Sequence, residues 1–383
     1  MNQHARVEQR PIPFIDVAAQ RRRLGKAIDE ATTRVLNHCQ FLMGPEVIAF
    51  EQQLAAYCGA KHAISCSSGT DALVMILMAK GIGRGDAVFC PTFTFCATAE
   101  SAALLGATPV FVDVDPDTFN IDAQSLKSAI TTAKAKGLKP KAVIPVDLFG
   151  LPADHDAIAE VSQAESLFIL DDAAQGFGGT YNGKPIGIFG HATATSFFPA
   201  KPLGCYGDGG AVLTDDDELL ATLKSVRVHG GGSDKYDNVR LGLTARLDTI
   251  QAAVLIEKLK IFREEIETRN LIAQRYSKAL QDVATVPVVP AGYGSVWAQY
   301  TIKLKPGKRD SLARALQAEG IPTAIYYAKP LHRQTAYRDF PAAQAGLAVS
   351  ERLADEVISL PMHAYLDEPT QDRIVDAVRR ALR

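Results

Sequence analysis

A lysine, a carboxylate, an aromatic ring and a Ser-Gly-Thr turn are the residues of this chain whose types and order suggest a shared chemistry. Lys201 lies in Ser196-Phe-Phe-Pro-Ala-Lys-Pro-Leu-Gly-Cys-Tyr-Gly-Asp-Gly-Gly210, where Pro199 and Pro202 predict a stiff loop after a strand. A lysine that forms a Schiff base must be held in place with its amine partly desolvated, so that a useful fraction is neutral. An isolated lysine is more often a surface residue in a turn, so the interpretation of Lys201 depends on the other motifs.

Two motifs upstream carry groups that bind ligands. The segment Ser67-Ser-Gly-Thr-Asp-Ala-Leu73 precedes an apolar helical pattern, and such a helix start offers free N–H groups and a positive dipole end to a phosphate. A plain helix cap is the alternative. Asp172 ends the apolar run of Ile169-Leu-Asp-Asp-Ala-Ala-Gln175, at the strand end where α/β sheets bind ligands. A carboxylate buried there needs a cationic partner, for which a protonated pyridine nitrogen would serve, whereas a capping aspartate is the alternative.

Phe95 adds a stacking surface. It follows Cys90-Pro-Thr-Phe-Thr94 at the expected end of another strand, where an aromatic ring can stack on a planar ligand or simply pack in the core. A phosphate turn, a stacking ring, a strand-end carboxylate and a later lysine together describe a site for pyridoxal phosphate. The combination is far more specific than any one of its members.

The elements that must position these residues form an α/β pattern. Short apolar runs predict strands at 87–90, 108–112, 142–146 and 167–170, helices are expected at 94–105 and 154–164, and an antiparallel strand is expected at 211–214. Buried strands separated by helices predict a large, mostly parallel sheet covered on both faces. A long helix from Arg246 to about Leu280 would bridge to a smaller α+β domain with a strand at 300–304, a helix at 310–319 and a closing helix from about 369. We therefore expect an N-terminal arm (1–27) and a large domain within 1–262, and a small domain at 263–383.

Composition excludes several classes of protein. The chain has 383 residues, 47% hydrophobic and 22% charged, with a net charge of −2, which gives no electrostatic case for nucleic acid or for an anionic membrane. The six cysteines form no CxxC pair, so no metal site is predicted. No apolar run is long enough to cross a bilayer, and the polar start shows no signal peptide. We expect a cytoplasmic protein with reduced cysteines.

The order of the motifs resembles the DegT/DnrJ/EryC1/StrS family of nucleotide-sugar aminotransferases, which use pyridoxal phosphate and have the aspartate-aminotransferase fold (fold type I). The resemblance runs from Phe14-Ile-Asp16 through Phe41-Leu-Met-Gly-Pro-Glu46 to Pro361-Met-His363, nearly the whole chain. It implies that Lys201 bonds covalently to the cofactor, Asp172 pairs with the pyridinium nitrogen, Gln175 touches the ring hydroxyl, Phe95 stacks on the ring, and Gly69, Thr70 and Ser196 hold the phosphate.

The resemblance also implies a homodimer with shared active sites. The family places residues of the second subunit in each site around Gly242-Leu-Thr-Ala-Arg-Leu-Asp248, and Arg246 matches the family arginine. Thr244 stands where many relatives have an asparagine that reaches the neighbour's cofactor phosphate, although a hydroxyl could still donate. Tyr326 and Tyr327 match positions near the sugar pocket, where Ala328 is unusual.

The reaction implied is a transfer of an amino group from glutamate, which leaves as 2-oxoglutarate, to a nucleotide-linked keto sugar. The sequences around Lys201 and Arg246 are most similar to those of enzymes that act on a UDP-linked 2-acetamido 3-keto hexose or hexuronic acid. Such enzymes serve bacterial surface polysaccharide or lipid A synthesis. A C4 aminotransferase of a UDP- or dTDP-linked 4-keto-6-deoxy sugar is the main alternative. A sugar dehydratase on this scaffold would replace Lys201 with histidine, and a non-catalytic regulatory protein would be expected to lose Lys201 or Asp172.

Overall fold

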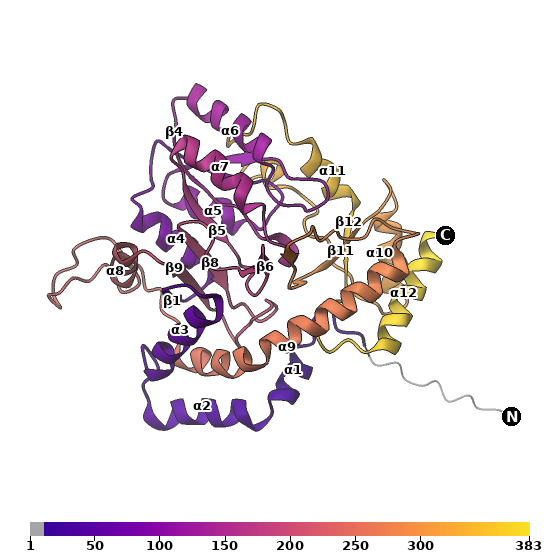
Figure 1. Ribbon diagram of the computed structural model, residues 1–383, viewed down its shortest axis with the longest axis horizontal. Helices are drawn as coiled ribbons and strands as arrows, with labels where there is room; N and C mark the ends of the chain where they lie inside the picture. The colour runs from indigo at the N-terminus through magenta and orange to yellow at the C-terminus, as the bar shows by residue number, and fades with distance from the viewer. Residues whose placement is uncertain (1–10) are drawn as a thin grey trace.

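A seven-stranded sheet forms the centre of the larger part of the molecule (Figure 1). The computed structural model describes residues 11–383. The strand order is β1-β9-β8-β5-β4-β2-β3. The strands are β1 (His62–Cys66), β2 (Asp86–Pro91), β3 (Thr108–Val112), β4 (Lys139–Val143), β5 (Phe168–Asp172), β8 (Ala192–Ser196) and β9 (Gly210–Thr214). The run from β3 to β8 is parallel, and β9 lies antiparallel between β8 and β1, so the predicted mostly parallel sheet is confirmed.

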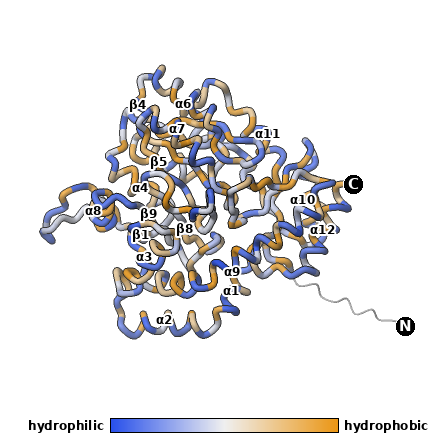
Figure 2. The backbone as a smooth tube through the Cα atoms, viewed as in Figure 1, coloured by the Kyte–Doolittle hydropathy of each residue, from blue (hydrophilic) through white to orange (hydrophobic). Residues whose placement is uncertain are grey.

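Helices cover both faces of this sheet. One face packs against α4 (Gly69–Ala79), α5 (Ala97–Leu104) and α8 (Asp217–Val226). The other packs against α6 (Ala123–Ala135), α7 (His155–Glu165) and α3 (Pro45–Cys58). Successive side chains of β2 enter the two cores in turn, because neighbouring side chains of a strand point to opposite faces. A strand buried on both faces therefore reads as a continuous apolar run, as Ala87-Val-Phe-Cys90 of β2 does. In Figure 2, hydrophilic segments lie mostly at the periphery of the molecule.

The long helix α9 (Thr249–Leu280) crosses from the large sheet to a second core (Figure 1). Its first half contributes Leu255 and Phe262 to the core beside β9, and its second half contributes Ile272 and Tyr276 to the C-terminal core. That second core also holds α10 (Arg309–Ala318), α12 (Glu368–Leu382) and the antiparallel pair β11 (Tyr300–Lys303) and β12 (Val357–Leu360). The division at residue 262 falls inside this continuous helix and stays a prediction.

The remaining elements are shorter or peripheral. Helix α1 (Val17–Leu24) lies in the predicted arm, and α2 (Lys26–His38) begins at its end and continues beyond it; residues 1–10 of the arm lie outside the described part. The others are the small sheet of β6 (Thr180–Tyr181), β7 (Lys184–Pro185) and β10 (Tyr293–Gly294), helix α11 (Ala348–Glu356), and the 3-10 turns η1 (Leu148–Gly150) and η2 (Leu331–Arg333).

Most predicted elements differ from the observed ones by one to three residues at an end, and two of these differences bear on the site. The strand expected at 142–146 is β4 at 139–143, because Pro145 has no N–H to donate and the chain then turns toward the site. The helix expected at 94–105 begins at Ala97, so Phe95 lies in the turn before it. Strand β12 was not predicted, because its run Val-Ile-Ser-Leu is too short to stand out.

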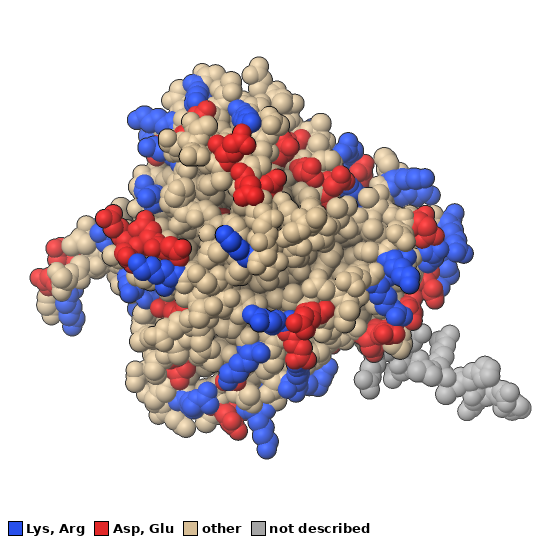
Figure 3. Space-filling model, in the orientation of Figure 1, with Lys and Arg blue, Asp and Glu red and all other residues tan. Residues whose placement is uncertain are grey.

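Charges are spread rather than gathered. On the face shown in Figure 3, acidic and basic side chains intermingle around the periphery and a central band is mostly uncharged. Within residues 11–383, no helix combines the length and apolar character needed to cross a membrane.

Candidate active site

The predicted site residues converge on one cavity of about 430 Å³ at the carboxyl ends of the parallel strands. All of them line it except Thr244 and Arg246. The lining set is Gly69, Thr70, Phe95, Asp172, Gln175, Ser196, Lys201, Tyr326 and Tyr327. They come from segments as much as 258 residues apart in sequence, so the fold, and not sequence proximity, brings them together.

Lys201 lies in the loop between β8 and β9, as the proline pair predicted. Its backbone N–H donates to Phe198 O at 2.8 Å, which closes a tight turn. Burial lowers the pKa of the Lys201 amine, and the attraction of Asp172 partly opposes that effect. The structure therefore supplies what a lysine nucleophile requires, a backbone anchored in a tight turn and an amine whose neutral fraction is increased by burial.

Asp172 ends β5 with its carboxylate buried in the cavity wall. One oxygen accepts a hydrogen bond from Thr98 Oγ1 at 2.9 Å, and the other accepts from Ala174 N at 3.2 Å. Burial raises the pKa of Asp172, while the Thr98 and Ala174 hydrogen bonds oppose that rise. Thr98 and Ala174 thus orient a carboxylate that lacks a full counter-charge, and a cation placed in the cavity would stabilise its ionised form.

The Ser-Gly-Thr turn opens α4 and faces the cavity. Ser68 caps the helix, with its Oγ accepting from Asp71 N at 3.0 Å, and the first N–H groups of the helix have no intrahelical partners. A Cβ built on Gly69 would lie 2.7 Å from Ser196 Cβ, and one on Gly210 would lie 2.4 Å from Ser68 C and O. Glycine at both positions lets β8 and β9 approach the turn closely, so a hydroxyl and helical N–H groups share one concave surface that suits a phosphate.

Gln175 is fixed by two protein partners. Its Oε1 accepts from Phe149 N at 2.7 Å and its Nε2 donates to Tyr327 Oη at 3.0 Å. Burial raises the pKa of Tyr327, so this hydroxyl stays protonated. The amide is therefore held at the cavity wall in one orientation, with one Nε2 hydrogen left to donate.

Thr244 and Arg246 lie outside this cavity. Thr244 is exposed, and its hydroxyl lies 2.6 Å from His229 Nε2. Arg246 is half-buried, and its Nε has no hydrogen-bond partner in the described part of the chain. Neither residue contributes to the cavity of its own chain, so any role at a cofactor site requires a second subunit.

Several residues at or beside the cavity were not predicted. Thr98 does not line the cavity but donates to Asp172 from the first turn of α5, and its place in the sequence gave no sign of that contact. Ile15 belongs to the Phe14-Ile-Asp16 motif but carries no chemical signal of its own. Gln299 and Asp208 line the cavity from a distant loop and from the glycine-rich segment, and no spacing pointed to them.

The residues present fit pyridoxal phosphate. The glycine-lined turn accommodates a phosphate, the buried Asp172 carboxylate accommodates a pyridinium nitrogen, and the buried Lys201 amine accommodates an aldehyde carbon. Phe95 lines the same cavity with its ring partly exposed, so a planar ligand could stack on it. Donors, acceptor and nucleophile thus match the polar groups of this cofactor.

Comparison with known proteins gives one consistent answer. Residues 22–379 match the DegT/DnrJ/EryC1/StrS aminotransferase family. The chain is 46% identical, over 93% of its length and 96% of the relative, to a UDP-2-acetamido-2-deoxy-3-oxo-D-glucuronate aminotransferase of Pseudomonas aeruginosa. It is 40% identical, over 97% of its length and 98% of the relative, to a UDP-N-acetyl-3-dehydro-alpha-D-glucosamine 3-aminotransferase of Acidithiobacillus ferrooxidans.

A solved structure extends the similarity to three dimensions. The crystal structure of a DegT DnrJ EryC1 StrS aminotransferase from Brucella abortus superimposes with a TM-score of 0.95 at 54% identity, covering 97% of this chain and 99% of that one. The predicted aspartate-aminotransferase-like fold is thereby confirmed.

Proposed function

Because the chain belongs to the DegT/DnrJ/EryC1/StrS aminotransferase family, we propose that it transfers an amino group from glutamate to a UDP-linked 2-acetamido 3-keto hexose or hexuronic acid. The family match makes it a sugar aminotransferase that uses pyridoxal phosphate. The observation that carries the proposal is the convergence of Lys201, Asp172 and the glycine-lined phosphate turn on one cavity. The donor, the sugar, and a role in bacterial surface polysaccharide or lipid A synthesis in the cytoplasm are the parts that we propose.

Each residue would have a distinct task. When bound, pyridoxal phosphate supplies an electron sink for the substrate's α-carbon. Asp172, oriented by Thr98, would hold a proton on the ring nitrogen. Lys201 would hold the cofactor and, once displaced by the amino donor, move a proton as general base and acid, for which its lowered pKa is suited.

The sugar assignment rests on the two relatives and on the chemistry of Arg246. Both relatives carry names that specify a UDP-linked 3-keto sugar with an N-acetyl group. A guanidinium with an unpaired buried Nε is suited to recognise a carboxylate, which only the hexuronic acid would offer. Loss of activity in Arg246→Ala toward the uronic acid, but not toward the neutral sugar, would assign the carboxylate to this residue.

The shared active site is the second part of the proposal. Phe41 N-terminal to α3 hydrogen-bonds through its carbonyl to Thr249 N at 2.9 Å, so the segment 41–43 lies beside the Arg246 segment. Its apolar side chains Phe41, Leu42 and Met43 are a little less than half exposed. Phe95 and Phe198 at the cavity are also about half exposed. Exposed apolar side chains at both places suit an interface with a second copy of the chain.

The absorption spectrum of purified protein tests the chemistry. With pyridoxal phosphate, we expect a visible band that glutamate bleaches in the wild type and that Lys201→Ala lacks. A panel of UDP-linked 3-keto and dTDP-linked 4-keto sugars would then identify the acceptor. A band that glutamate leaves unchanged would refute the donor, and no band in the wild type would refute cofactor binding.

Mixing two variants that are each inactive toward the UDP-linked uronic acid tests the shared site, with that sugar as the acceptor in the assay. If Arg246 serves the partner's cavity, a hybrid dimer of Lys201→Ala and Arg246→Ala subunits has one intact site, because the remaining Lys201 meets the remaining Arg246. Random re-association should restore about a quarter of wild-type activity. If both residues act within one chain, mixing restores none, and a monomer with full activity would also refute the shared site.

A further inference from the structure

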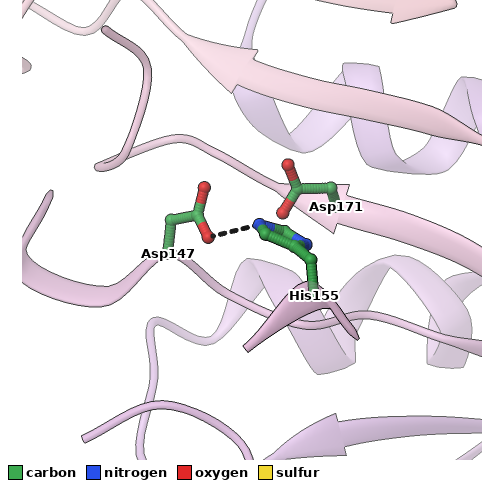
Figure 4. Close-up of side chains that lie close together, drawn as sticks. All are labelled: Asp147, His155 and Asp171. Carbon is green, nitrogen blue, oxygen red and sulfur yellow. Dashed lines mark ion pairs between the residues drawn. The ribbon is translucent and has the colours of Figure 1, made fainter. Parts of the chain in front are cut away.

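A buried histidine between two aspartates lies directly behind the candidate cofactor site. His155 begins α7, Asp147 follows β4, and Asp171 is in β5 (Figure 4). A ring nitrogen of His155 and one carboxylate oxygen of each aspartate all lie within 4.8 Å of one another. His155 Nε2 lies 3.4 Å from Asp147 Oδ1. Both aspartates are fully buried, and His155 is only 5% exposed. This His155 cluster (Asp147, His155 and Asp171) was not predicted from the sequence.

The His155 cluster is joined to Asp172 through the backbone. Asp171 and Asp172 are consecutive in β5, so their side chains point to opposite faces of the sheet. Asp172 faces the cavity, and Asp171 faces α7. The Asp147 N–H donates to Asp172 O at 3.1 Å, which fixes Asp147 beside the same strand end. Two carboxylates therefore lie close behind the one that would pair with the cofactor.

The cluster has too few hydrogen bonds for neutral polar packing. Asp147 Oδ2, His155 Nε2 and Asp171 Oδ1 are buried without a hydrogen-bond partner among residues 11–383. The imidazole is otherwise enclosed by aromatic rings, stacked on Phe189 with centroids 4.7 Å apart and edge-on to Tyr181. Unpartnered polar atoms in such surroundings are costly unless charges of opposite sign offset one another.

The surrounding titratable groups favour a charged imidazole. Burial alone would lower the pKa of His155, but Asp171, Asp147 and Asp154 outweigh it and raise the pKa to about 9. Tyr181, the titratable group on β6 beside the ring, donates a hydrogen bond from its hydroxyl to Asp154 Oδ1 at 3.1 Å. Burial and the nearby Asp147 raise the pKa of Asp171, whose carboxylate also accepts from Thr193 Oγ1 at 3.4 Å.

We propose that His155 is a positioning residue for the cofactor site: as an imidazolium between Asp147 and Asp171, it offsets the buried negative charge behind Asp172 and so keeps the Asp172 carboxylate ionised. A neutral side chain at 155 would leave Asp172 beside the uncompensated charge of Asp147, which already raises the pKa of Asp172. Like charges disfavour ionisation. The proposal rests on the proposed role of Asp172 toward the ring nitrogen. It adds that the charge of the His155 cluster, on the opposite face of the sheet, determines whether Asp172 is ionised at the cavity.

A single and a double variant together distinguish a charge effect of His155 from a packing effect. His155→Leu keeps an apolar contact for Phe189 but removes the cation, and we expect the apoprotein to bind pyridoxal phosphate about tenfold more weakly, which corresponds to one pKa unit at Asp172. Asp147→Asn in the His155→Leu background removes one carboxylate charge, while its Oδ1 can still accept from Ala153 N, as Asp147 Oδ1 does at 2.8 Å. This double variant should recover most of the lost affinity. Equal losses in the single and the double variant, or no loss in the single variant, would overturn the proposal.

Two further measurements keep the test independent of folding and of enzyme activity. In the apoprotein, the imidazole NMR signal that disappears in His155→Leu should titrate near pH 9, and a signal already neutral at pH 7 would overturn the proposal. Inorganic phosphate would bind at the turn and not at Asp172, so it should bind wild type and variants alike if the cavity is intact. A stoichiometric divalent metal that is lost with His155→Leu would also overturn it, because the metal would then be the offsetting charge. Failure of the wild type to bind pyridoxal phosphate would instead refute the cofactor assignment.

Discussion

Gly210→Ala should weaken cofactor binding by displacing the Ser-Gly-Thr turn. The added Cβ would lie 2.4 Å from Ser68 C and O and 2.7 Å from Gly69 N, whereas carbon contacts are ordinarily about 3.5–4.0 Å. About 1 Å of movement is therefore needed. Gly210 is paired in the sheet with both Cys66 of β1 and Ser196 of β8, so the turn, which has no ladder to hold it, is the part that moves.

The expected magnitude follows from hydrogen-bond geometry. A phosphate oxygen held at about 2.9 Å by a helical N–H would be separated by roughly 3.9 Å after such a shift, beyond hydrogen-bonding distance. One charge-assisted hydrogen bond contributes about 1.5–3 kcal/mol, so its loss should weaken binding by about 10- to 100-fold. Overpacking should also lower the free energy of unfolding by about 1–3 kcal/mol.

The assay is a titration of apoprotein with pyridoxal phosphate, followed by visible absorption, with urea unfolding measured in parallel. Gly83→Ala is a matched control, because its Cβ would meet nothing closer than Leu105 O at 3.6 Å and Gly83 does not line the cavity. The control should bind like the wild type. If folded Gly210→Ala binds within twofold of the wild type, the assignment of the phosphate to this turn is wrong.

Three further predictions concern buried polar groups. Asp172→Asn should weaken cofactor binding about 10- to 100-fold yet leave the apoprotein at least as stable as the wild type. The reason is that burial raises the pKa of this carboxyl, so its ionised form is costly in the apoprotein. A calorimetric melt of each apoprotein checks the stability. Burial lowers the pKa of His363 to about 4, so the unfolded chain binds a proton that the folded chain does not between pH 6.5 and 4. Stability should therefore fall as the pH drops through that window, by up to about 3 kcal/mol, and urea midpoints of His363→Asn should show a flatter pH dependence. Lys258→Met should cost about 1–3 kcal/mol in urea unfolding, because the Lys258 amine, 2.6 Å from Gly204 O, supports the loop that carries Lys201; an unchanged midpoint would refute that support.

The sequence was most informative where a function depends on local backbone structure. An apolar run that ends in Asp172, a hydroxyl-rich helix start at Ser68, and a lysine between prolines each describe a local geometry that few residues determine. The strand at 108–112 was predicted at its observed bounds for the same reason, because five consecutive apolar or β-branched residues between turns have few alternatives.

Tertiary structure decided which of these local features meet, and in what electrostatic surroundings. The strand order places β5 next to β8, so Asp172 and Lys201 share a cavity, and it brings Thr98 from α5 within 2.9 Å of that carboxylate. The His155 cluster depends on the same packing, since a histidine that opens a helix gives no sign in sequence of the aspartates that will enclose it. Burial and charge proximity are properties of the packed chain, and they set the pKa values on which this chemistry depends.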